Sequence, residues 1–162
     1  MLLAAAIAAP AHAGSGPGTA KTFVLGPVAM LNTAPLDFGN IIPVGGGTVT
    51  VDAQTGVRTS TGVVLAGGTV SNAQFIATGT PNQTVTITLS PLPIVITSGA
   101  NSMSINQVRV SVNGGGPQPV GPNANLGPIG VINYAVGGRL NVGATQAPGT
   151  YTGSFSLTMD YQ

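Results

Sequence analysis

The chain contains no cysteine, no tryptophan and no glutamate, and its single histidine is His12. Without cysteine there is no disulfide framework, no thiolate nucleophile and no metal site of the cysteine type. Histidine and glutamate are among the usual general bases of enzymes, so their scarcity removes most acid–base chemistry. We therefore expect a protein that is not an enzyme and that binds no cofactor and no metal ion.

Charged residues are also rare: they make up 4% of the 162 residues, against about 25% in an average soluble domain. The formal net charge is +1, so no basic surface is available for nucleic acid or for an anionic membrane. Solubility then depends on Thr, Ser, Asn, Gln and exposed backbone. A net charge this small favours association between molecules.

The three carboxylates, Asp37, Asp52 and Asp160, lie far apart in the sequence. A calcium loop would need clustered oxygen ligands, as in D-x-D-x-D, and no such cluster occurs. The glycine runs at 45–47 and 114–116 are followed by Thr-Val and Pro-Gln-Pro. A phosphate-binding loop would instead need a following helix and usually a lysine. The aspartates are therefore interpreted as turn-forming or solvated residues.

The N-terminus reads MLLAAAIAAPAHA. Its apolar run is too short to span a bilayer, which takes about 20 residues, and Ala11-His12-Ala13 has the small-x-small pattern of a cleavage site. We expect residues 1–13 to be a signal peptide and the mature chain, without a membrane span, to reach the periplasm, the cell surface or the extracellular space. No Lys or Arg precedes the apolar run. A start upstream of Met1, or an apolar terminus that is not cleaved, therefore remains the alternative.

Alternating apolar and polar residues dominate the rest of the chain, and Gly or Pro interrupts nearly every stretch long enough for a helix. The alternation predicts strands in four segments: GTVTVDA, QTVTITLSP, NQVRVSVNG and GVINYAVGGRLNVG. Gly137-Gly138 in the last of these indicates a bulge or bend. Residues 114–128, rich in Gly and Pro, are expected to form a long surface loop. Strands separated by such turns predict one all-β domain, a single antiparallel sandwich.

Three segments that together cover most of residues 36–162 resemble one protein family. Leu36-Asp37-Phe38-Gly39 is followed by the strand Gly-Thr-Val-Thr-Val, then by TGTPNQTVTITL, and the chain ends LNVGATQAPGTYTGSFSLTMDYQ. This combination resembles the bacterial secreted domain-of-unknown-function family 4402. The family is similar, more remotely, to spore-coat-U-like proteins and to the fimbrial subunits of chaperone–usher pathways. The resemblance implies an immunoglobulin-like sandwich with Greek-key connections, exported to the cell surface.

The C-terminus alternates regularly between small or apolar residues at odd positions and polar residues at even positions. Fimbrial subunits end with such a strand, which borders a groove that a strand from another protein fills. They also carry a penultimate tyrosine and a glycine fourteen places from the end, positions that Tyr161 and Gly149 occupy here. The alternative is an ordinary last strand of a complete sandwich. The candidate assembly edge consists of Gly149, Tyr151, Phe155, Leu157, Met159 and Tyr161.

The stretch from Phe23 to Leu31 has two interpretations. As a strand donated to a neighbouring molecule it would present Val24, Gly26, Val28 and Met30; as the first strand of its own domain it would leave only Gly14–Gly18 as a tail. Pro27 restricts either strand to an edge or a bend. The expected organisation is a signal peptide at 1–13, an extension or first strand at 14–31, and a sandwich domain at 32–162.

From these observations we expect a non-enzymatic structural protein of the cell surface, such as a pilus-like or coat-like subunit. Its partner would be a second copy or a periplasmic chaperone, bound by β-strand addition. The alternative is a stand-alone secreted adhesin or binding module with a complete sandwich. Sugar binding is disfavoured because sugar platforms use exposed aromatic rings, and aromatic residues make up only 4% of the chain.

Overall fold

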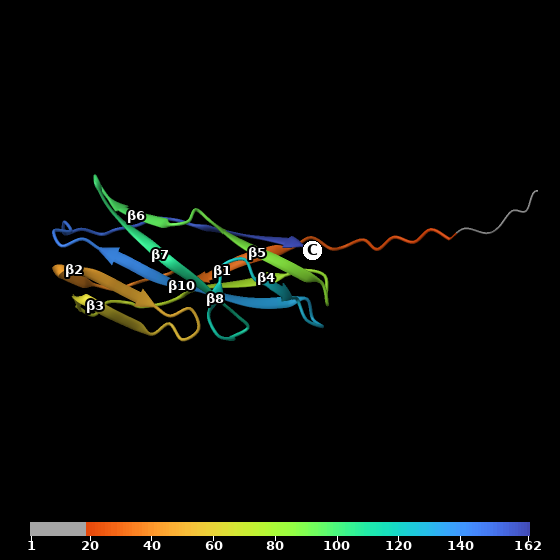
Figure 1. Cartoon of the computed structure of the whole chain (residues 1–162). Helices are drawn as coiled ribbons and strands as arrows, with labels where there is room; N and C mark the ends of the chain where they lie inside the picture. The colour runs from red at the N-terminus through yellow and green to blue at the C-terminus, as the bar shows by residue number, and fades with distance from the viewer. Residues whose placement is uncertain (1–18) are drawn as a thin grey trace, which may run out of the picture.

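The computed structural model describes residues 19–162, which form eleven β-strands and no helix (Figure 1). Within this range, therefore, no helix is present that could cross a membrane. The predicted signal peptide at 1–13 and the tail at 14–18 lie outside the described residues. The strands are β1 (Ala29–Ala34), β2 (Ile41–Val51), β3 (Arg58–Leu65), β4 (Ala73–Thr78), β5 (Thr84–Ser90), β6 (Ile94–Ser98), β7 (Asn101–Val112), β8 (Gln118–Pro119), β9 (Asn123–Asn125), β10 (Val131–Val142) and β11 (Ser156–Tyr161).

Two antiparallel sheets form the domain, and β10 is the centre of the larger one. One edge of β10 pairs with β4 and then with β2, while the other edge pairs with β7. Strand β1 adds to β4, β3 adds to β2, and β6 and β8 add to β7. The smaller sheet has the order β11-β5-β9. The predicted all-β sandwich is confirmed.

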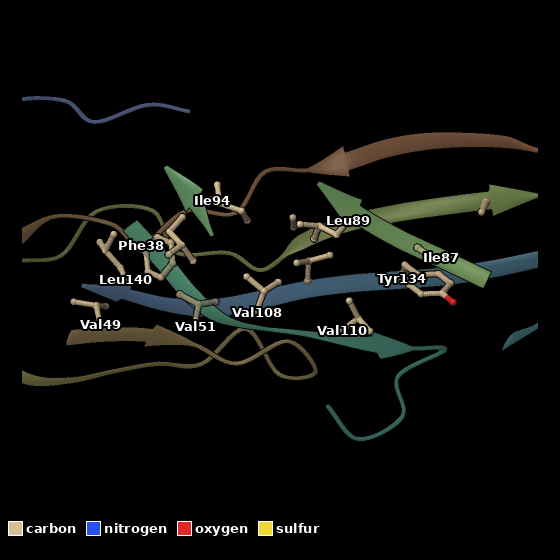
Figure 2. Close-up of a cluster of buried hydrophobic side chains, with 14 of the residues drawn as sticks. Phe38, Val49, Val51, Ile87, Leu89, Ile94, Val108, Val110, Tyr134 and Leu140 are labelled. Carbon is tan, nitrogen blue, oxygen red and sulfur yellow. The ribbon is translucent and has the colours of Figure 1, made fainter. Parts of the chain in front are cut away.

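The alternation in the sequence accounts for the core. In β5, Val85, Ile87 and Leu89 are buried, while Thr84 and Thr88 are exposed. Strand β10 buries all its even positions in the same way. Figure 2 shows these side chains gathered between the sheets, with Phe38, Ile94 and Leu140 at one end of the cluster and Tyr134 with Ile87 at the other. Two buried faces of this kind supply the hydrophobic stabilisation of a sandwich.

The glycine pair in β10 is a bulge, as predicted. The register between β10 and β7 shifts between Gly137 and Arg139. A Cβ atom on Gly137 would collide with the carbonyl oxygen of Val51 and lie 2.5 Å from the backbone nitrogen of Ala53. The close approach of β2 therefore requires glycine at this point of the strand.

The Gly- and Pro-rich segment 114–128 is more ordered than the surface loop that its composition predicts. It contains β8 and β9, and β9 pairs with β5. Leu126 is fully buried in the core, and Asn123 accepts a hydrogen bond of 2.6 Å from Thr86. One buried leucine and a three-residue strand are enough to attach this segment to the smaller sheet.

Candidate strand-accepting groove

Strands β1 and β11 each have one unpaired edge. β1 is an edge strand of the larger sheet and pairs with β4. β11 is an edge strand of the smaller sheet and pairs with β5. Within residues 19–162 no strand pairs with the other edge of either. The backbone N–H and C=O groups on such edges are available to a further strand.

The two edges run antiparallel beside each other. The hydroxyl of Tyr161, at the end of β11, donates a hydrogen bond of 2.9 Å to the carbonyl of Gly26, just before β1. At the other end, residues 35–41 and 149–153 line the two sides of one open cavity of about 760 Å³. We call the space between these two lines of chain the groove, residues 35–41 its N-terminal wall and residues 149–153 its C-terminal wall.

The floor of the groove at the cavity is apolar. Ile105 of β7 and Leu140 of β10 are almost fully buried, and Met103 lies beside them with 8% of its surface exposed. Ile96 of β6 completes the floor next to the C-terminal wall. These side chains form the base of the cavity and keep little apolar surface exposed to solvent.

The N-terminal wall is hydrogen-bonded on the side away from the groove. Asp37 and Ser71 exchange both backbone hydrogen bonds, at 2.9 and 3.1 Å. Asn40 pairs in the same way with residues 66–67, at 2.9 Å for each bond. The wall is therefore held from one side at Asp37 and at Asn40, with a turn at Gly39 between them, and its other side faces the groove.

Arg58 braces this wall, and within residues 19–162 its guanidinium group contacts backbone carbonyls and no carboxylate. Its Nη1 donates to the carbonyl oxygens of Phe38 at 2.6 Å, Gly67 at 3.3 Å and Asn40 at 3.4 Å. Since Nη1 carries two hydrogens, at least one of them is shared between two of these carbonyl oxygens. The same group would meet a Cβ atom at Gly39, where φ is +64°, so glycine is required there.

The C-terminal wall is also paired on one side only. Thr97 of β6 and Thr152 exchange backbone hydrogen bonds of 2.8 and 3.0 Å. The hydroxyl of Tyr151 donates to the carbonyl of Ala147 at 2.8 Å and accepts from Gln146 Nε2 at 2.7 Å. The tyrosine thus fixes the loop that leads into the wall, and its ring lines the cavity.

The predicted assembly edge lies along this groove. The even positions 156, 158 and 160 of β11 are exposed, as the alternation predicts, whereas Met159 is buried. Phe155 stacks edge-on against Phe75 of β4, with ring centroids 6.1 Å apart. The remaining predicted residues lie at the groove: Gly149 is exposed on the C-terminal wall, and Tyr151, Leu157 and Tyr161 are half-buried against the core.

The structure divides the four residues of the predicted donor strand. Met30 lies in β1 opposite Ala77, and Val28 packs against the core of its own domain. Gly26 is hydrogen-bonded through both its N–H and its C=O, and only Val24, 84% exposed, stands clear of the domain. The stretch from Phe23 to Leu31 thus supplies a first strand from Ala29 onward and a free segment before Gly26.

The carboxylates serve turns. Asp37 accepts the backbone N–H of Gly39 at 2.8 Å, and Asp52 accepts from the backbone and hydroxyl of Thr55 and the backbone of Gln54. The hydrogen bond from the Thr55 backbone is the main reason why the pKa of Asp52 is lowered, and it outweighs the opposing effect of burial. In the part of the chain that the structure describes, no three His, Cys, Asp or Glu residues gather where a metal ion could bind.

Three residues of this site, Arg58, Gly79 and Thr80, have no distinctive sequence pattern around them. Arg58 follows a turn and reads as a surface charge. Gly79 and Thr80 read as turn residues, yet Thr80 donates its backbone N–H to the Tyr161 hydroxyl at 2.7 Å. A Cβ atom on Gly79 would lie 2.7 Å from that hydroxyl oxygen.

Comparison with known proteins places the chain in one family. The model of the family described as a domain of unknown function, DUF4402, matches residues 28–161. The match begins just before β1 and ends at the last residue of β11, so it covers the whole sandwich and excludes the segment before Val28. The searches for similar curated proteins and for similar solved structures returned no match. The chain therefore belongs to the DUF4402 family.

Proposed function

We propose that this protein is a non-enzymatic structural subunit of the bacterial cell surface that associates with its partner by accepting a β-strand. One observation carries the proposal: a groove with apolar residues at its base lies between residues 35–41 and residues 149–153, and within residues 19–162 the backbone of each wall is hydrogen-bonded to one neighbouring segment. An incoming strand would pair with both inner edges and place alternate side chains on the floor.

Two further features support a structural role rather than catalysis. Asp37 and Asp52 bind backbone groups of their own turns, and Asp160 stands exposed on β11. No carboxylate pair arises from these positions. Export rests on the sequence of residues 1–13, and the cell-surface role rests on the remote resemblance to fimbrial subunits.

The alternative, a stand-alone secreted adhesin or binding module, needs a sandwich whose edges are complete within one chain. Exposed apolar side chains on the paired strands β2 and β3, among them Ile42 and Val64, would give such a module a contact surface. Open edges on both β1 and β11 favour strand addition over this alternative.

Sedimentation velocity combined with amide hydrogen exchange tests the proposal. The full chain should associate as its concentration rises, and the amides of residues 35–41 and 149–153 should gain protection in the associated form. A chain that remains monomeric at every concentration and refolds cooperatively alone contradicts the proposal. Association without added protection at the two walls contradicts it as well.

A further inference from the structure

Residues Thr19–Leu25, which we call the extension, project away from the domain (Figure 1). All seven are exposed, and within residues 19–162 none forms a hydrogen bond. Phe23, Val24 and Leu25 are respectively 69%, 84% and 36% exposed. Three consecutive large apolar residues in water mark a surface that a partner covers.

A junction fixes the point where the extension leaves the domain. Gly26 donates its N–H to the hydroxyl oxygen of Thr80 at 2.7 Å and accepts from the Tyr161 hydroxyl at 2.9 Å. The Thr80 backbone N–H in turn donates to Tyr161 at 2.7 Å. Both polar backbone groups of Gly26 are thus held by the domain, so the extension leaves beside the C-terminus (Figure 1).

The cavity lies at the opposite end of the groove. Its N-terminal wall leads into β2, which starts at the end of the sandwich farthest from the C-terminus (Figure 1). To reach the cavity of its own domain, the extension would have to reverse direction next to Pro27 and release Gly26. The junction therefore favours another molecule as the acceptor.

We propose that the extension of one copy occupies the cavity half of the groove of a second copy, running parallel to the N-terminal wall and antiparallel to β11. This inference rests on the proposed function and names its partner. Seven residues of strand reach roughly 23 Å. That length covers the cavity only if the donor domain sits at the cavity end of the acceptor.

If the extension ran in the opposite direction through the groove, the junction ends of the two copies would lie against each other. The seven residues would then lie beside β1 and β11 and stop short of the cavity. The chosen direction instead joins the junction end of one copy to the cavity end of the next. Such a contact between unlike surfaces repeats from copy to copy and produces a filament when the rotation between copies does not close a ring.

The spacing of residues sets the register. Counted along the two chains, Leu25 beside Ile41 puts Lys21 beside Asp37, with the turn at Gly39 between them. On the other side the same four-residue interval runs from Gly149 to Gly153. All four of these acceptor residues line the cavity.

This register places Phe23 and Leu25 over the apolar floor and Lys21 at the rim beside Asp37. Within residues 19–162 neither Lys21 nor Asp37 forms a hydrogen bond or ion pair with a residue of opposite charge. An ion pair at the rim would fix the orientation of the bound extension more than it would increase its affinity for the groove.

Disulfide cross-linking between two separately purified full-length variants tests direction and register, because the natural chain has no cysteine. Val24 falls level with Thr150 in the proposed arrangement, so Val24→Cys should form a disulfide with Thr150→Cys of the other chain under mild oxidation. Asp160→Cys is the matched control for the reversed direction. A cross-link to position 160 in place of 150, or disulfides only between two chains of the same variant, overturns the inference.

Substitutions in the extension test the occupant itself. Phe23→Asp should abolish association and Thr22→Asp should preserve it, because the two side chains face opposite ways in a strand. Lys21→Asp should weaken association, while Lys21→Arg should not. If Phe23→Asp associates like the natural chain and the walls still gain amide protection, another strand fills the groove. In that case this inference fails and the proposed function stands.

Discussion

Tyr161 and Gly26 are 135 positions apart in the chain, yet the tyrosine hydroxyl donates a hydrogen bond of 2.9 Å to the glycine carbonyl. The same hydroxyl accepts from the backbone N–H of Thr80. The penultimate residue thus closes one end of the groove and holds the base of the extension. The regular C-terminal strand is ordered to its end because its last side chain ties three segments together.

Tyr161→Phe should lower the free energy of unfolding by about 1–2 kcal/mol. The change leaves the partly buried N–H of Thr80 without its acceptor, and an unmet group of this kind carries that cost. Urea unfolding measures the effect. A variant that unfolds at the natural urea concentration would mean that the junction adds nothing to the stability of the domain.

The alternation of β11 gives a matched pair of substitutions. Met159→Asp would bury a charge and should cost several kcal/mol. Thr158→Asp, on the exposed side, should change stability by less than about 0.5 kcal/mol. Thermal unfolding of both variants compares them directly. Similar losses at the two positions would show that β11 is not half-buried in this register.

Because of the buried Tyr134 we expect the domain to lose stability at alkaline pH. Burial raises its pKa from 10 to about 12, and in the described part of the chain its hydroxyl has no hydrogen-bond partner. The folded state holds the proton of Tyr134 more tightly than the unfolded state does. The stabilisation of the folded state that results is therefore fully present below pH 10 and is lost as the pH rises to 12. The loss amounts to roughly 3 kcal/mol.

Tyr134→Phe tests this assignment. The variant should lack that part of the alkaline loss and should be no less stable than the natural chain at neutral pH, because it removes an unpaired buried hydroxyl. Urea unfolding at several pH values between 8 and 12 measures both effects. An unchanged alkaline loss in the variant would exclude Tyr134 as its source.

Alternation predicted the strands, the buried faces and the bulge at Gly137, since these depend on local periodicity. The walls of the groove escaped prediction because residues 35–41 and 149–153 are irregular. Their positions depend on backbone hydrogen bonds to Ser71 and Thr97, partners distant in sequence. Likewise, the stretch from Phe23 to Leu31 is continuous in hydrophobicity, and only the tertiary contacts of Gly26 divide it into extension and strand.

Isothermal titration calorimetry of a synthetic peptide, Thr19–Leu25, into the full-length Phe23→Asp variant tests the central claim most directly. The variant keeps the groove, while its own extension should no longer compete for it. We predict saturable binding of one peptide per chain, and no binding of the same peptide with aspartate in place of phenylalanine. No binding of the natural peptide, or equal binding of both peptides, would contradict the account.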